Sequence, residues 1–138
     1  MKLDGKVALI TGASRGIGSA IALALSKNGA SVIINYSKDE QGARETLRQI
    51  QIAGGYAAIK QFDIRNYKSC SEAADSIYRQ FGKIDILVNN AGISKIGLFI
   101  DSTEEDWNYL IDTNLKGTFN MTHSVLKHMM KFKSGSIL

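Results

Sequence analysis

Four short, mostly apolar runs recur along the chain, and each is followed by a segment with helical periodicity. The runs cover residues 6–11, 31–35, 56–61 and 85–89. Strands buried on both faces have such continuous apolar sequences, whereas strands with one solvated face alternate. This alternation of strand and helix predicts right-handed βαβ units and a parallel sheet covered by helices on both faces.

The segments between these runs predict four helices. The first carries Ile17, Ile21, Ala24 and Leu25 on one face and ends at Asn28. The others are expected over residues 39–53, 66–81 and 103–131, with Ser102 or Thr103 as the N-cap of the last. A fifth strand is expected to begin at residues 136–138.

A glycine-rich turn follows the first predicted strand and opens the first helix. It reads Thr11-Gly12-Ala13-Ser14-Arg15-Gly16-Ile17-Gly18. Backbone N–H groups and the helix dipole make such a turn a binding site for the diphosphate of a nucleotide. Its glycine spacing, G-x-x-x-G-x-G, is wider than the G-x-G-x-x-G typical of dinucleotide-binding proteins.

This wider turn resembles that of the short-chain dehydrogenase/reductase family, whose members share T-G-x-x-x-G-x-G. Asn89-Asn90-Ala91-Gly92 after the fourth strand and Asn114 on the long helix are similar to the family's second and third signatures. Within the family the chain is most similar to bacterial 3-oxoacyl-(acyl-carrier-protein) reductases. Residues 92–99 and 115–119 also resemble a branch of elongation factor P 5-aminopentanone reductases.

The resemblance implies an α/β fold, a Rossmann-type doubly wound parallel sheet with strand order 3-2-1-4-5. Because the family's sheet has seven strands, residues 1–138 are expected to form a single, incomplete dinucleotide-binding domain, truncated in or just after the fifth strand. The edge left at that strand, together with apolar residues of the long helix, predicts marginal stability or self-association of the isolated chain.

The resemblance also implies a cofactor site at the ends of the first four strands. Asp63 and Ile64 are expected beside the adenine, and Asn90, Ala91 and Gly92 beside the ribose and nicotinamide. From the residues alone, Asp63 could equally be a turn residue, and Asn89-Asn90 could tie neighbouring strands together. The predicted cofactor-binding residues are Gly12, Ser14, Arg15, Gly16, Ile17, Gly18, Ser37, Lys38, Asp63, Ile64, Asn90, Ala91 and Gly92.

The end of the second strand favours NADPH over NADH. Enzymes that prefer NAD place an acid there, which binds the ribose 2′-hydroxyl. Here Lys38 follows the strand and Arg15 lies in the glycine turn, while Asp39 and Glu40 suit the first turn of the next helix. Two cations favour a 2′-phosphate.

In this family a tyrosine protonates the substrate carbonyl, assisted by a lysine, a serine and an asparagine. Asn114 matches the asparagine and is expected to face inward with Trp107 and Val125. The other three residues would follow the fifth strand, so the 138 residues are expected to lack catalysis. Tyr56 and Lys60 have the required spacing but are rejected, because on a strand four residues span about 13 Å, against about 6 Å on a helix.

Composition excludes several other functions. The single cysteine, Cys70, cannot form an internal disulfide, and with no signal peptide this predicts a cytoplasmic protein. No apolar run is long enough to span a membrane. The net charge of +4 is concentrated late and indicates solvated cations at a helix end more than a nucleic-acid surface. His123 and His128 are five residues apart, which is poor spacing for metal ligands, so no metal site is predicted.

The function favoured by these observations is the NADPH-dependent reduction of a carbonyl, such as a 3-oxoacyl thioester or a similar ketone, to an alcohol. The expected substrate is a small molecule or an acyl-carrier-bound group, and the full-length protein is expected to be a homo-oligomer without nucleic-acid or membrane partners. The alternative is a non-catalytic nucleotide-binding or interaction fragment.

Overall fold

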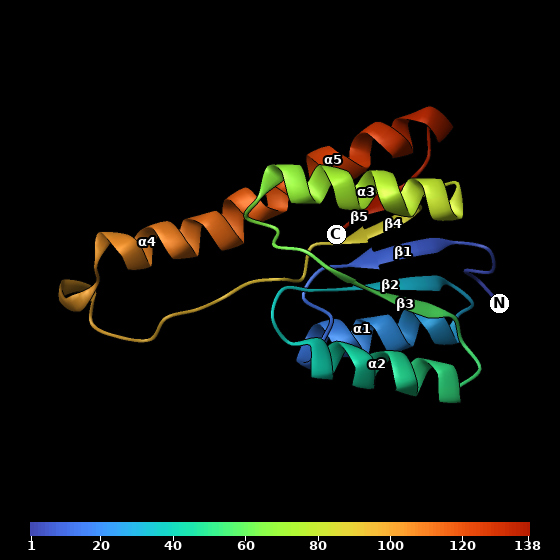
Figure 1. Ribbon diagram of the computed structural model, residues 1–138, viewed down its shortest axis with the longest axis horizontal. Coiled ribbons are helices and arrows are strands. Elements are labelled where there is room, and N and C mark those ends of the chain that lie inside the picture. Colours follow the sequence, from blue (N-terminus) through green and yellow to red (C-terminus); the bar gives the residue numbers. More distant parts are fainter.

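A five-stranded parallel sheet forms the centre of the protein in the computed structural model, which describes residues 1–138 (Figure 1). The strand order is β3-β2-β1-β4-β5, and every neighbouring pair is parallel. The predicted fold class and strand order are therefore confirmed. The strands are β1 (Val7–Ile10), β2 (Ser31–Tyr36), β3 (Ala57–Gln61), β4 (Ile86–Val88) and β5 (Ser136–Ile137).

Helices cover both faces of this sheet. Helices α1 (Gly16–Lys27) and α2 (Glu40–Ile52) lie side by side on one face, and α3 (Tyr67–Phe81) and α5 (Gly117–Phe132) lie side by side on the other (Figure 1). β1 pairs with β2 on one side and β4 on the other, so the chain reverses its direction of winding between β1 and β4. In open α/β sheets, ligands bind outside the carboxyl ends of the strands at such a point.

The alternating side chains of β1 supply two separate cores. Val7 and Leu9 pack in the cluster under α3 and α5, whereas Ala8 and Ile10 pack in the cluster under α1 and α2. All four residues are buried. Burial on both faces explains why the strand sequence is continuously apolar.

The buried face of α1 differs from the predicted one. Gly18, Ala22 and Ser26 are buried, whereas Ile17 is exposed. The small residues recur every four positions and let the helix approach the sheet closely, so the larger Ile21 and Leu25 pack beside this line. The prediction was based on the large apolar residues of the helix. It therefore placed the buried face of α1 about one residue away from the observed face.

The long helix predicted over residues 103–131 is divided. Helix α4 (Glu104–Ile111) starts at an N-cap formed by Thr103, as expected, and passes through the π-helical turn η2 (Asp112–Lys116) into α5. Helix α4 has no buried residues, and together with the preceding loop and the 3₁₀ turn η1 (Phe99–Asp101) it projects from the sheet as an arm (Figure 1).

The prediction that Trp107 and Asn114 face inward with Val125 is wrong, because both are exposed while Val125 is buried. A π-helical turn has more residues per turn than an α-helix, so positions on either side of it no longer share one face. The inward face of α5 is instead formed by residues that include Asn120, Met121, Val125 and Met129.

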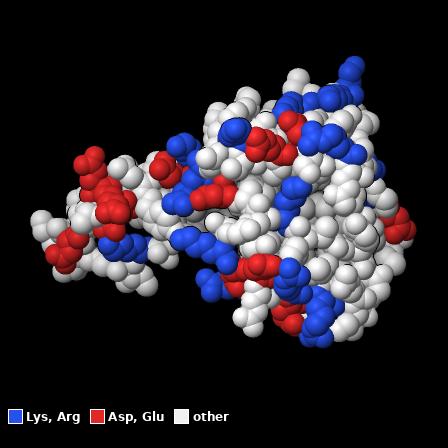
Figure 2. Space-filling view, in the orientation of Figure 1, with Lys and Arg blue, Asp and Glu red and all other residues white.

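Positive and negative side chains are interspersed over the face shown in Figure 2. Among the late lysines, Lys127 forms an ion pair with Asp75 at 2.9 Å, and the ammonium of Lys131 lies 4.4 Å from the centroid of the Tyr78 ring. No helix has both the length and the hydropathy needed to cross a bilayer.

Candidate nucleotide-binding cleft

A cleft of about 480 Å³ lies at the carboxyl ends of the strands and is formed by the loops that follow β1 to β4. This volume is within the range of small-molecule sites. Every residue predicted to bind the cofactor lines this cleft, although the residues come from four separate loops. They are Gly12, Ser14, Arg15, Gly16, Ile17, Gly18, Ser37, Lys38, Asp63, Ile64, Asn90, Ala91 and Gly92.

The shape of the turn after β1 requires glycine. Gly12 and Gly16 have φ angles of +62° and +57°, which side chains rarely permit. A Cβ atom at Gly18 would lie 2.5 Å from both the Asn90 amide nitrogen and the Gly12 carbonyl oxygen. The turn can therefore fold against the loop after β4 only because this position has no side chain.

The N-terminus of α1 is left without a cap. Its N-cap residue, Arg15, makes no capping hydrogen bond, and the first turn contains no acidic residue. By contrast, Asp39, Asn66 and Thr103 cap α2, α3 and α4 through their side chains. The first N–H groups of α1 thus have no side-chain partner at the place where the helix meets the cleft, which suits them to bind an anion.

Asn90 ties the loop after β4 to the glycine turn. Its side-chain amide donates to the carbonyl oxygens of Thr11 at 2.9 Å and Gly12 at 3.0 Å. In return, the Thr11 hydroxyl accepts hydrogen bonds from the backbone N–H groups of Asn90 and Ala91, each at 3.0 Å. Asn90 therefore has the structural role considered above and also lines the cleft.

Asn35, at the end of β2, is a positioning residue that the sequence analysis missed. It is buried, and its side-chain oxygen accepts a hydrogen bond from the Gly12 N–H at 3.1 Å. Its amide nitrogen donates to the Phe62 carbonyl oxygen at 3.0 Å. The only signal in the sequence was a polar residue at the end of an otherwise apolar strand.

The cleft beside β2 carries Arg15 and Lys38, as expected for a phosphate site, but it also includes Asp39. Hydrogen bonds from the Gly42 backbone and the Ser14 side chain hold the pKa of Asp39 below its usual value. The Gly42 N–H donates to its carboxylate at 3.0 Å. This carboxylate is therefore engaged as the cap of α2, in agreement with its expected place at the start of that helix.

Asp63 forms a turn after β3. Its carboxylate accepts a hydrogen bond from the Arg65 backbone N–H at 2.9 Å, which is the turn role considered above. It also binds the Arg65 guanidinium at 3.0 and 2.6 Å. This side-chain hydrogen bonding holds the pKa of Asp63 below its usual value, so the carboxyl group is ionised at neutral pH.

Asn114 does not line the cleft but holds the loop next to it. Its amide nitrogen donates to the Ile93 carbonyl oxygen and its side-chain oxygen accepts from the Ile93 N–H, both at 2.9 Å. A Cβ atom at Gly92 would lie 3.3 Å from the Asn114 oxygen. The π-helical turn thus directs Asn114 toward the loop that follows Gly92.

The rejected pair Tyr56 and Lys60 lies outside the cleft. The Tyr56 ring packs edge-on against Phe81 with centroids 6.0 Å apart, and the Lys60 ammonium donates to the Ser76 hydroxyl at 2.6 Å. Both partners are on α3, so the two side chains share one face of the sheet, as the sequence analysis expected.

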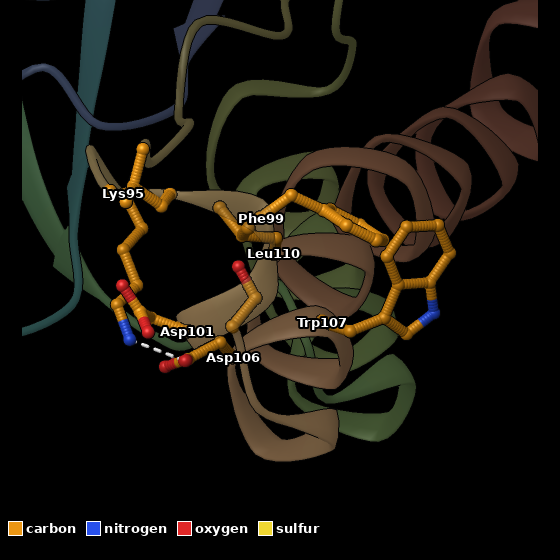
Figure 3. A pocket seen from close by; sticks show the side chains of 9 residues that line it. Lys95, Phe99, Asp101, Asp106, Trp107 and Leu110 are labelled. Atoms are coloured by element: carbon orange, nitrogen blue, oxygen red, sulfur yellow. Dashed lines mark hydrogen bonds and ion pairs between the residues drawn. The ribbon is translucent and has the colours of Figure 1, made fainter.

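A second hollow of about 240 Å³ lies in the arm, between the loop before η1 and α4 (Figure 3). Phe99, Trp107 and Leu110 form its apolar side. Two of its charged groups already have partners, because the Lys95 ammonium pairs with the Asp106 carboxylate, and Asp106 also accepts a hydrogen bond from the Thr103 N–H at 3.0 Å.

Other reactive side chains are engaged in the body of the protein. Burial raises the pKa of the Cys70 thiol to about 12. His128 is buried, with Nε2 2.8 Å from the Asp75 carboxylate, whereas His123 lies 3.0 Å from the Tyr67 hydroxyl. The two histidines therefore have separate surroundings, and no group of three or more potential metal ligands is found.

Comparisons with known proteins agree with this geometry. The family model described as short chain dehydrogenase matches residues 6–138. A 3-oxoacyl-(acyl-carrier-protein) reductase of Synechocystis is 42% identical over 136 residues, and one of Staphylococcus epidermidis is 40% identical over 133 residues. These matches cover 99% and 96% of this chain but 55% and 54% of the relatives, so the chain spans about half their length.

Solved structures show the same fold. A short-chain oxidoreductase from a metagenome, determined in complex with NADP, has a TM-score of 0.95 at 35% identity, and the match covers 62% of that structure's chain. An alcohol dehydrogenase of the short-chain type from Sinorhizobium meliloti has a TM-score of 0.92 at 36% identity and is covered to 54%. Each match includes 99% of this chain.

Proposed function

The chain belongs to the short-chain dehydrogenase family, and from this we propose that it is the cofactor-binding part of an NADPH-dependent carbonyl reductase. The reaction is the reduction of a ketone, such as a 3-oxoacyl thioester, to an alcohol. The bound cofactor supplies the hydride. The residues that line the cleft bind and orient that cofactor.

The proposal rests mainly on the N-terminus of α1, which has no side-chain cap and lies in the cleft. A diphosphate at this place would accept hydrogen bonds from N–H groups that have no side-chain cap. A Cβ atom built at Gly16 would have no atom within 4 Å, so this glycine faces open space and leaves the backbone at the start of α1 accessible to a ligand. The site therefore fits the group that the family binds.

The positions of Arg15 and Lys38 support a preference for binding NADPH over NADH. Both line the cleft beside the end of β2, where the ribose 2′ position is expected. The carboxylate of Asp39 lies there too, but it is engaged by the Gly42 N–H. A 2′-phosphate would thus meet two cations and a carboxylate that already caps a helix.

We propose that Asn114 holds the loop after Gly92 in position. Its two hydrogen bonds fix the carbonyl and amide of Ile93, which lines the cleft beside Gly92. We propose that this arrangement supports proton transfer to the substrate oxygen in the whole protein. The tyrosine, lysine and serine used in the family have no counterpart among the 138 residues, so we expect these residues alone to bind cofactor weakly and to lack turnover.

The substrate class is suggested by relatives. Two of them are named as reductases acting on 3-oxoacyl groups carried by acyl-carrier protein, and a similar solved structure holds NADP. We propose the same chemistry for the whole protein, as a cytoplasmic homo-oligomer.

A fluorescence titration with NADPH and NADH tests the cofactor assignment. Arg15→Glu is expected to weaken NADPH binding at least about 10-fold and NADH binding much less, because only NADPH has the 2′-phosphate. Arg79→Glu is a matched control, since Arg79 is exposed on α3 and does not line the cleft. Equal losses for the two cofactors would contradict the NADPH preference, and no binding by the unmodified chain would contradict the cofactor site.

A further inference from the structure

Arg65 is held in one orientation at the end of the cleft that follows β3. Its guanidinium donates to both carboxylate oxygens of Asp63, to Oδ1 at 3.0 Å and to Oδ2 at 2.6 Å, and its backbone N–H donates to the same carboxylate. Paired contacts of this kind restrict the guanidinium plane. The side chain is nevertheless about one third exposed, and it lines the cleft.

The guanidinium of Arg65 also lies over the ring of Tyr109 in α4. The Arg65 Cζ atom is 5.0 Å from the centroid of the Tyr109 ring, which is the geometry of a cation–π contact. Tyr109 also lines the cleft. The contact joins the projecting arm to the loop after β3, across this end of the cleft.

Thr113, one helical turn beyond Tyr109, lines the same end of the cleft. Its hydroxyl is the only buried side-chain oxygen of the protein without a hydrogen-bond partner. A buried polar atom without a partner is uncommon in folded proteins and calls for an explanation. A ligand with hydrogen-bonding ring atoms would supply the missing partner.

We propose that Arg65 is a binding residue for the adenine ring of the nucleotide, with its guanidinium stacked on the ring and supported by Asp63 and Tyr109. The inference rests on the proposed cofactor binding. With the diphosphate at the turn after β1 and the ribose beside the end of β2, the base extends toward the end of β3, where Arg65 lies. Ile64 offers it an apolar wall, and Thr113 a hydroxyl.

This role depends on the planar shape of the guanidinium more than on its charge. A guanidinium stacks on aromatic rings and binds a carboxylate in two places, whereas an ammonium does neither. Lysine at this position would retain the positive charge but lose the flat surface. Because adenine is common to NADPH and NADH, the loss should be the same for both, in contrast to the effect of Arg15.

The test is a titration of the chain and its variants with NADPH and NADH, followed by fluorescence. Arg65→Lys and Arg65→Gln are both expected to weaken binding of each cofactor about 3- to 30-fold. Tyr109→Leu is expected to weaken binding more than Tyr109→Phe, which retains the ring. Arg79→Lys controls for an arginine outside the cleft, and thermal unfolding of every variant checks that it is folded.

The outcomes separate this inference from the cofactor assignment. Normal binding of both cofactors by folded Arg65→Lys would overturn the role of the guanidinium while leaving the cofactor site in place. A loss confined to NADPH would also overturn it, because Arg65 would then bind the 2′-phosphate. If the unmodified chain binds neither cofactor, the proposed function fails and this inference fails with it.

Discussion

The side-chain oxygen of Asn35, at the end of β2, accepts a hydrogen bond from the backbone N–H of Gly12 in the turn after β1, at 3.1 Å. The same side chain donates to the carbonyl oxygen of Phe62, beyond β3. One buried amide thus joins the carboxyl ends of three adjacent strands. It fixes the glycine turn relative to the loops that complete the cleft.

Asn35→Leu is expected to destabilise the protein by about 1–3 kcal/mol, because the Gly12 N–H and the Phe62 carbonyl lose their buried partner. Chemical denaturation followed by circular dichroism measures this change. Asn28→Leu provides the comparison, since Asn28 is exposed and its side chain bonds only the Ala24 carbonyl. Similar losses for the two variants would mean that the buried amide has no special role.

Asn114→Ala is expected to release the loop after Gly92, because both hydrogen bonds to Ile93 are lost. The Ile93 amide should then exchange its hydrogen faster, by about 5- to 100-fold if the lost contacts contribute about 1–3 kcal/mol. Hydrogen exchange followed by NMR measures this directly. Asn108→Ala, on the exposed surface of α4, should leave the rate unchanged. Unaltered protection of Ile93 in Asn114→Ala would count against the positioning role.

Gly18→Ala is expected to destabilise the fold by about 1–3 kcal/mol through overpacking, because the new Cβ would meet Asn90 and the Gly12 carbonyl at 2.5 Å. Nucleotide binding should weaken as well, since the glycine turn must shift. Gly97→Ala is the control, because nothing lies within 4 Å of its Cβ position and its φ is not positive. Thermal unfolding of the two variants compares them, and equal midpoints would refute the clash.

The carboxylate of Asp106 should make the arm sensitive to acid. The hydrogen bond from Lys95 and those from the Thr103 backbone and side chain lower the pKa of Asp106 to about 2, from a usual value of 3.8. Its ionised form therefore stabilises the folded arm above about pH 4, and this contribution is lost as the pH falls toward 2. Hydrogen exchange in α4 at pH 5 and pH 2.5 should show the loss.

Asp106→Asn should remove part of that difference, because the amide does not titrate. Asp101→Asn removes a neighbouring carboxylate that forms no ion pair, and it serves as the control. If Asp106→Asn and the unmodified protein lose the same protection between the two pH values, the pairing with Lys95 is not the cause.

Cys70 should be unreactive in the folded protein. The thiolate is the nucleophile, and burial raises the pKa of this thiol to about 12, so the reactive form is scarce at pH 8. Labelling with a thiol reagent should be slow in buffer and fast in denaturant, where the thiol becomes accessible. Rapid labelling of the native protein would show that α3 opens readily.

Much of the fold could be predicted because its signals are local. The apolar runs at residues 6–11, 31–35 and 85–89 predicted strands that are buried on both faces. Residue type predicted the N-cap of α4, where Thr103 is the cap and Ser102 was the other candidate. The residues that line the cleft were predicted from the glycine turn, the end of the second strand, the Asn89–Gly92 segment and the family resemblance. Parallel strands have their carboxyl ends at one edge of the sheet, and this brings the four loops together.

Other features could not be read from neighbouring residues. The face of α1 was misplaced because small residues make the close contact, and the large ones guided the prediction. The π-helical turn at residues 112–116 changed the face that Asn114 presents. Asn35 is a single polar residue, and nothing adjacent in the sequence indicates that its partner is Gly12.

The amino-acid sequence thus determined the strands, the helices and the chemical groups of the cleft, because hydrophobic periodicity and backbone preference act over a few residues. The tertiary structure decided which polar groups meet: Asn35 with Gly12, Asn114 with Ile93 and Arg65 with Tyr109. These contacts join residues 21 to 44 positions apart. Hydrogen bonds and cation–π contacts depend on distance and direction in space, and only the packed sheet and helices set these.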